Sequence, residues 1–304
     1  MTRAILDLGT NTFHLLIGTL VNNKLNVLVD EKLAVKIGEK GMMAGIITAE
    51  AQQRAIEALL FFKTIIESFP SIEQIQVIAT SAFRNANNAL NVCEAIYNNT
   101  GFEVRIISGD QEAKLIYEGV KLSGALQQDP ALIVDIGGGS VEFIICNQHN
   151  YLWKQSFDIG GLRLMERFHH SDPILPEEIN AIEQHLHQEL TDLHEAVLRY
   201  KPTFLLGSSG AFDTYIDIHY TQQNFPVPNE IVHSLPLDSF MQMHHDFITK
   251  TKAERLAMPG MIPLRAEMIV VASCLTKFLL QNYQLNNIVT SRFALKEGAF
   301  VFQF

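Results

Sequence analysis

The sequence predicts an α/β protein made of two related domains, each with a mixed β-sheet flanked by helices. Two observations predict this fold class. Strands and helices alternate along the chain, and one β-hairpin pattern occurs at residues 4–20 and again at residues 132–148. In both copies an apolar strand ends in Asp, an apolar residue and Gly, and short polar residues lead into a second apolar strand. The repeat indicates a duplicated domain.

The first domain is expected at residues 1–125. Its hairpin is followed by a turn and a third strand over residues 25–37. Residues 49–68 have helical periodicity, and a second helix at 87–101 is closed by Gly101. The remaining elements are strands at 75–82 and 102–108 and a helix from about Gln111 to Ser123.

The second domain is expected at residues 126–304, after the polar, proline-containing stretch at 124–130. A third strand follows its hairpin at 152–160. We expect helices at 176–200, 210–220, 236–251 and 264–283, with short strands at 203–207 and 287–291. The apolar C-terminal segment, residues 293–304, is expected to form a helix that packs on the chain's own core, although it could also pack across a homodimer interface.

Composition excludes several classes of protein. The chain has 304 residues, of which 47% are hydrophobic and 18% charged, so each domain can bury its own core. A formal charge of −10 argues against non-specific binding to nucleic acid or to a membrane surface. No signal peptide or membrane-spanning stretch is recognised, and the three cysteines lie far apart in apolar surroundings. A cytoplasmic location is therefore expected.

The first copy of the hairpin carries a candidate phosphate loop. Asp7 ends its first strand, and the turn that follows contains short donors and a glycine that lets backbone amides approach an anion. Taken alone, this pattern also fits a structural turn. The phosphate-binding candidates here are Gly9, Thr10, Asn11 and Thr12. His14 lies just beyond them, where it could simply pack or form a hydrogen bond.

The second copy is a stronger signal, because three successive glycines are seldom needed merely to turn a chain. Asp135 and Glu142 are oxygen ligands suited to a hard cation such as Mg²⁺. A third strand also ends in glycine and small hydroxyl residues, although a plain strand-to-helix connection would look the same. The phosphate-binding candidates of these two loops are Gly137, Gly138, Gly139, Ser140, Gly207, Ser208, Ser209 and Gly210.

These loops, with further strings, resemble the exopolyphosphatase and guanosine pentaphosphate phosphatase family of the actin-like ATPase superfamily. Sugar kinases and chaperone ATPases share the phosphate loops but lack the string at residues 106–120. The resemblance implies two ribonuclease-H-like domains with the active site in the cleft between them. The similar strings lie at 7–17, 79–88, 106–120, 134–143, 157–168, 207–212 and 294–300.

The resemblance also implies roles for individual residues. Glu112 corresponds to the family's general base, which orients or deprotonates the attacking water, and Arg84 to the arginine that grips the terminal phosphate. Read without the family, Glu112 is an ordinary glutamate in the first turn of a helix. Asp7, Asp135 and Glu142 would hold Mg²⁺, or another divalent cation such as Mn²⁺, directly or through water.

The function expected from this resemblance is hydrolysis of terminal phosphate from inorganic polyphosphate. The closest alternative is hydrolysis of guanosine pentaphosphate at its 5′ end, which uses the same chemistry on a nucleotide. A non-catalytic sensor of polyphosphate or nucleotide would also keep the phosphate loops, but Glu112 favours an enzyme. Base recognition, chain-length preference and a possible homodimer are not readable from the sequence.

Overall fold

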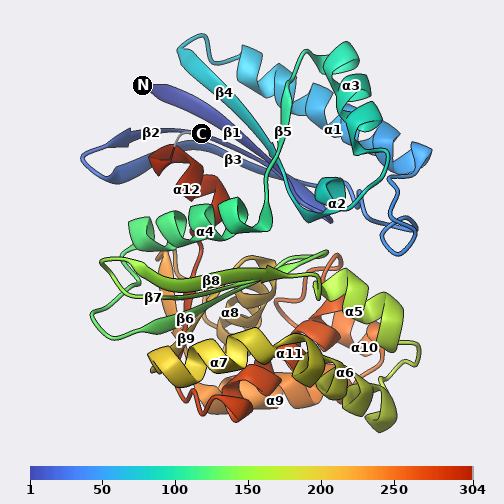
Figure 1. Cartoon of the computed structure of the whole chain (residues 1–304), viewed down its shortest axis with the longest axis vertical. Helices are drawn as coiled ribbons and strands as arrows, with labels where there is room; N and C mark the ends of the chain where they lie inside the picture. Colours follow the sequence, from blue (N-terminus) through green and yellow to red (C-terminus); the bar gives the residue numbers. More distant parts are fainter. Residues whose placement is uncertain (303–304) are drawn as a thin grey trace. The chain divides into compact units, whose positions relative to one another are not determined.

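The computed structural model describes residues 1–302 and separates into two compact units (Figure 1). Unit 2 is Ser123–Ala294, and unit 1 joins Met1–Leu122 to the segment that begins at Leu295. The predicted division into residues 1–125 and 126–304 differs from this at the C-terminal end. The last helix, α12 (Leu295–Val301), packs on the first two strands of unit 1, a non-local contact that sequence order does not reveal.

Unit 1 contains a mixed sheet in the order β3-β2-β1-β4-β5. The first three strands are antiparallel neighbours, whereas β4 and β5 continue the sheet parallel to β1. Asn22 and Asn23 have φ angles of 50° and 58°, so the turn between β2 and β3 is a hairpin turn of the kind that asparagine tolerates. The strands are β1 (Thr2–Leu8), β2 (Thr12–Val21), β3 (Lys24–Ala34), β4 (Ile72–Ala79) and β5 (Val104–Ile106).

Figure 1 shows α1 and α3 on one side of this sheet and α4 and α12 on the other. Helix α1 begins after Thr48, whose side chain accepts a hydrogen bond from the amide of Ala51, and α3 ends at Gly101 in a left-handed conformation. A side chain at Gly298 would collide with the carbonyl of Leu115, so glycine lets α12 approach α4. Besides α12, the helices of unit 1 are α1 (Ala49–Glu67), α2 (Ser81–Arg84), α3 (Ala89–Thr100) and α4 (Gly109–Ser123).

The sheet of unit 2 repeats the connectivity of unit 1. Its order is β10-β11-β9-β6-β7-β8, in which β6, β7 and β8 are antiparallel neighbours and β9 and β11 run parallel to β6. An additional edge strand, β10, was not predicted. The strands are β6 (Ala131–Ile136), β7 (Val141–Cys146), β8 (Tyr151–Phe157), β9 (Phe204–Ser208), β10 (Val232–Leu235) and β11 (Ile288–Ser291). The predicted pair of ribonuclease-H-like domains is confirmed.

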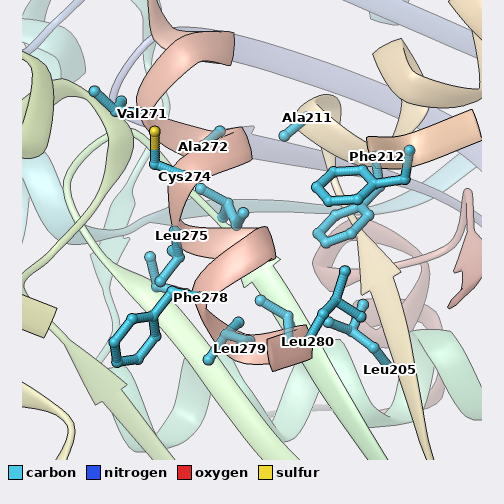
Figure 2. Close-up of a cluster of buried hydrophobic side chains, with 14 of the residues drawn as sticks. Leu205, Ala211, Phe212, Val271, Ala272, Cys274, Leu275, Phe278, Leu279 and Leu280 are labelled. Carbon is cyan, nitrogen blue, oxygen red and sulfur yellow. The ribbon is translucent and has the colours of Figure 1, made fainter. Parts of the chain in front are cut away.

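The core of unit 2 is organised around α11, which is apolar on all sides and packs on α5, α6, α8 and α9. In Figure 2, Leu280 of this helix lies beside Leu205 of β9, with Phe212 of α8 on the same side, whereas Val271 and Phe278 lie on the other side of the helix. The single helix predicted at 176–200 is two helices, because the chain breaks at Leu190. The helices are α5 (Gly161–Phe168), α6 (Pro176–Glu189), α7 (Thr191–Tyr200), α8 (Gly210–Gln222), α9 (Leu237–Thr249), α10 (Lys252–Leu256) and α11 (Met268–Asn282).

The two hairpins recognised in the sequence have the same register. In unit 1, Asp7 on β1 lies opposite His14 on β2, and in unit 2, Asp135 on β6 lies opposite Glu142 on β7. The equivalent aspartates therefore occupy the same place in both sheets. Among residues 1–302, no helix is both long and apolar enough to cross a membrane.

Candidate active site

The first loop, residues 9–12, is fixed through its carbonyl groups. The carbonyl of Thr10 accepts a hydrogen bond from the amide of Gly38 (3.1 Å), and that of Asn11 accepts from the amides of Val35 (3.0 Å) and Lys36 (2.8 Å). In a trans peptide the carbonyl and the following N–H point in opposite directions. The amides that follow these carbonyls are therefore directed away from the supporting segment, as an anion site requires.

The side chains around this loop include the predicted Asp7 and the unassigned His14. Asp7 is half-buried at the end of β1, whereas Thr10 and Thr12 are buried. The hydroxyl of Thr12 lies 3.0 Å from Nε2 of His14, and which of the two donates depends on the tautomer of the ring. His14 thus orients a hydroxyl of the loop rather than only packing.

The second loop, residues 137–140, is fixed by the start of α5. Three successive carbonyls of the loop accept hydrogen bonds from backbone amides of that helix start. These bonds are Gly161 to Gly137 (2.9 Å), Leu162 to Gly138 (2.8 Å) and Gly160 to Gly139 (3.3 Å). Peptide planarity again turns the following N–H groups, those of residues 138–140, away from the helix that holds them.

Two buried carboxylates lie beside the second loop. Oε1 of Glu142 accepts hydrogen bonds from the hydroxyls of Ser140 (2.7 Å) and Ser156 (2.6 Å), and Oδ2 of Asp135 accepts one from Ser208 (2.7 Å). Glu142 is only 1% exposed and Asp135 7%. Hydroxyl donors offset part of the cost of burying these charges. The bond to Ser208 also joins the second loop to the third.

The third loop, residues 207–210, connects β9 to α8 and has a strained backbone. Ser209 has a φ of 68°, a region that side chains other than glycine rarely occupy, and its hydroxyl donates to the carbonyl of Ile136 (3.2 Å). A side chain at Gly207 would collide with the ring of Phe212. The loop leads into the N-terminus of a 13-residue helix, which favours negative charge.

Arg265 is a component of this site that the sequence analysis missed. It is 8% exposed, and its guanidinium lies against Gly210, where any side chain would collide with it. Burial lowers the pKa of Arg265, while the carboxylates of Asp213 and Asp135 oppose that shift. A buried cation thus adjoins the third loop. The available signal was a charged residue three positions before the apolar helix α11.

The predicted catalytic pair, Arg84 and Glu112, is brought together in unit 1. Nη1 of Arg84 lies 2.8 Å from Oε2 of Glu112 and also donates to the carbonyl of Ile107 (3.2 Å). The side chain of Glu112 is 9% exposed and that of Arg84 is 20% exposed. Ser108 and Gln111 form a reciprocal cap at the start of α4, which fixes the turn that carries Glu112. Arg84 lies on α2 and Glu112 on α4, so tertiary folding brings the pair together.

The three predicted metal ligands do not form a cluster. Within residues 1–302 no group of three or more His, Cys, Asp or Glu side chains is arranged to hold a metal ion. Asp135 and Glu142 are opposite one another in unit 2, whereas Asp7 belongs to unit 1. Magnesium commonly uses one or two carboxylates and completes its shell with water and substrate phosphate. The two carboxylates of unit 2, Asp135 and Glu142, fit a cation held in that shared way.

Two pockets of unit 2 lie apart from the predicted site residues. Unit 2 has cavities of about 260 Å³ and about 300 Å³, the first lined in part by His169 and Arg255 and the second by His187 and Tyr283. Neither is lined by any of the predicted phosphate-binding, catalytic or metal-binding residues. The loops and the carboxylates, rather than the cavities, define the candidate site.

The chain is similar in sequence to known proteins over nearly its whole length. The chain is 26% identical over 295 residues to a Haemophilus influenzae protein classed provisionally as an exopolyphosphatase, with 97% of the chain and 89% of that protein covered. It is also 26% identical to a guanosine-5′-triphosphate,3′-diphosphate pyrophosphatase of Pseudoalteromonas translucida, but it spans only 58% of that longer protein.

Solved structures show the same relationship. The crystal structure of an exopolyphosphatase from Cytophaga hutchinsonii superimposes with a TM-score of 0.95 at 38% identity, covering 99% of this chain and 97% of the other. A Ppx/GppA protein from Aquifex aeolicus shares the fold, with a TM-score of 0.82 at 24% identity and coverage of 99% and 96%. The sequence profile of the Ppx/GppA phosphatase family matches residues 16–303. This chain belongs to the Ppx/GppA phosphatase family.

Proposed function

We propose that this protein is an exopolyphosphatase, which hydrolyses the terminal phosphoanhydride bond of inorganic polyphosphate. The observation that carries the proposal is the 2.8 Å pair of Glu112 and Arg84, a largely buried carboxylate held by an arginine. The similarity to the Cytophaga hutchinsonii exopolyphosphatase, which extends over nearly the whole of both chains, supports polyphosphate as the substrate.

Glu112 is proposed to act on the attacking water. Phosphoryl transfer needs an aligned nucleophile and stabilisation of charge more than it needs covalent help from the protein. The water oxygen forms a bond to the terminal phosphorus, its proton passes to the carboxylate of Glu112, and the bridging P–O bond breaks. Arg84 fixes the orientation of Glu112, and a planar guanidinium of this kind is suited to bidentate contacts with the oxygens of the terminal phosphate.

Each of the loops is proposed to bind phosphate. Carbonyls of both hairpin loops are occupied by their supports, so their amides are oriented to donate to phosphate oxygens. Arg265 and the N-terminus of α8 add positive potential beside the third loop. These groups compensate locally for the negative charge of the chain.

A divalent cation, Mg²⁺ or Mn²⁺, is proposed to be held by Asp135, with Glu142 and Asp7 contributing directly or through water. When bound, such a cation neutralises negative charge on phosphate oxygens. Asp135 and Glu142 lie opposite one another beside the second loop, so both carboxylates are candidate ligands. Asp135→Asn should therefore raise the Mg²⁺ concentration that gives half-maximal activity by at least about tenfold. An unchanged metal dependence would remove Asp135 from this role.

Hydrolysis of guanosine pentaphosphate is the second candidate, favoured by the relative from Pseudoalteromonas translucida. Initial rates on long polyphosphate, tripolyphosphate, ATP and guanosine pentaphosphate, measured side by side at equal concentration, separate the two. Our proposal predicts the highest kcat/KM on a polyphosphate. A clear preference for guanosine pentaphosphate would replace it with the second candidate, and binding of ligand without release of phosphate from any of them would indicate a sensor.

A further inference from the structure

The start of α5 holds the glycine loop of unit 2 by unusually close contact. A side chain at Gly160 would lie 2.5 Å from backbone atoms of both Gly138 and Gly139, so two backbone segments touch with no room for a β-carbon. Besides the three amide-to-carbonyl bonds described above, a side chain of α5 donates to the backbone of the loop. Nε of Arg163 donates to the carbonyl of Gly139 (2.9 Å).

The bond from Arg163 occupies the last carbonyl before Ser140. That carbonyl also accepts the longest of the three backbone bonds, 3.3 Å from Gly160, so the side chain contributes the closer contact. The peptide between Gly139 and Ser140 places the N–H of Ser140 opposite this carbonyl. The bond from Arg163 therefore helps to fix the amide of Ser140, whose hydroxyl in turn bonds to Glu142.

We propose that Arg163 is a positioning residue that fixes the phosphate-binding loop at residues 137–140. The inference rests on the proposed function, because it takes that loop to bind phosphate. In the first loop, the carbonyls of Thr10 and Asn11 are held by backbone amides. Unit 2 thus adds a side chain to the backbone bonds that hold its loop.

A rival role for Arg163 is direct attraction of the substrate by its charge. Its side chain is 21% exposed, and Asp158 lies 3.8 Å away as a partial counter-charge. The two roles can be separated because Nε2 of glutamine lies the same number of bonds from Cα as Nε of arginine. Arg163→Gln keeps a donor within reach of Gly139 but removes the charge, whereas Arg163→Met keeps the length and removes both.

The test measures kcat and KM for tripolyphosphate, together with the thermal midpoint, in these two variants and in Arg167→Gln. Arg167 is on the same helix and exposed, so its variant removes the same charge from another place. Loss of one well-oriented hydrogen bond corresponds to a change of about tenfold. We expect Arg163→Met to raise KM about tenfold, Arg163→Gln to stay within about threefold of the parent, and Arg167→Gln to match the parent.

Two results would overturn the inference. If Arg163→Gln were as impaired as Arg163→Met, and the defect shrank with added salt, charge rather than positioning would be responsible. If Arg163→Met lowered the thermal midpoint but left kcat and KM at parent values, its role would be structural. Failure of the parent to release phosphate would sink the proposed function separately. In that case the dissociation constant of tripolyphosphate, measured by calorimetry, must show the same order of variants for the inference to stand.

Discussion

The β1–β2 hairpin of unit 1 and the β6–β7 hairpin of unit 2 have one backbone plan and different chemistry. A β-carbon at Gly9 would lie 3.0 Å from the carbonyl of Thr12, and one at Gly137 would lie 2.9 Å from that of Ser140. Across from the equivalent aspartates stand His14 in unit 1 and Glu142 in unit 2, and each bonds to the hydroxyl two residues before it.

The two hairpins share some features and differ in others. Backbone geometry and the hydroxyl contact are the same in both hairpins, so they belong to the loop itself. The residue opposite the aspartate decides the charge, because unit 2 has two buried carboxylates where unit 1 has a carboxylate and an imidazole. We infer that the unit 2 hairpin is the one suited to a divalent cation.

Among the changes that compare the two hairpins, the largest effect should come from crowding the contact between α5 and the second loop. Gly160→Ala places a β-carbon 2.5 Å from backbone atoms that cannot move independently, so the loop must shift. We expect phosphate release to fall by at least about a hundredfold. Gly161→Ala is the matched control, because its nearest new neighbour would be Cε of Met268 at 3.5 Å. Equal activity of the two variants would show that the close contact between Gly160 and the second loop is not needed for phosphate release.

A smaller difference should follow when the equivalent hydroxyls are removed. Ser140→Ala removes one of the two serine hydroxyls that donate to the buried carboxylate of Glu142. Thr12→Val removes the hydroxyl that bonds to His14, and because His14 is half-buried, water can replace that hydroxyl. We expect losses in the free energy of unfolding of about 3 kcal/mol and about 1 kcal/mol, respectively. Urea unfolding of both variants measures them, and the reverse order would contradict the comparison.

Acid should weaken unit 2 in particular. His14 is the sole histidine in the sequence of unit 1, whereas His244 is buried in unit 2 between α9 and α11, with Nδ1 3.0 Å from Ser273. Burial, followed by the charges of Lys277 and His245, lowers the pKa of His244 to about 4. Between the ordinary pKa and this value the unfolded chain binds a proton that the folded chain does not, so stability falls as pH falls.

From pH 7 to pH 5 this group should cost up to about 2 kcal/mol. Trp153 is the single tryptophan of the chain and lies on β8, so its fluorescence reports urea unfolding of unit 2. His244→Gln should flatten the pH dependence in part, because burial also lowers the pKa values of His169 and His233. An unchanged slope in that variant would exclude His244 as a cause.

The smallest effect concerns the strand-to-helix turns, which also differ between the units. Ser209 before α8 has a φ of 68°, whereas Thr80 before α2 has a φ of −115°. Ser209→Gly relieves strain but also removes the hydroxyl that donates to Ile136, so it should leave the free energy of unfolding within about 0.5 kcal/mol of the parent, while Thr80→Gly should lower it by about 1 kcal/mol. If both glycine variants were destabilised to the same degree, Ser209 would not be strained.

Local features of the sequence predicted most of the fold. The hairpins, their three loops and most helices depend on patterns within a few residues, and the structure confirms these elements. The break at Leu190 was missed because no glycine or proline marks it. The assignment of α12 was missed because it depends on contacts with strands at the other end of the chain.

Residues that act through distant partners were harder to find. Arg163 bonds to a carbonyl 24 residues away, and Arg265 lies against Gly210, so neither belongs to a local pattern. Arg84 and Glu112, 28 residues apart, were named through family resemblance alone, and the structure places them in contact. Their catalytic roles stay predictions.

The most direct test of hydrolysis by Glu112 is release of orthophosphate from tripolyphosphate by Glu112→Gln. Glutamine preserves the size of the side chain and can still accept a hydrogen bond from Arg84, but it is a far weaker base. Glu94→Gln is the matched control, because Glu94 is exposed on α3 of the same unit.

We expect Glu112→Gln to release phosphate at least about a thousandfold more slowly than the parent, while tripolyphosphate still raises its thermal midpoint. Glu94→Gln should match the parent in both measurements. Release of orthophosphate by Glu112→Gln at the parent rate would contradict the account.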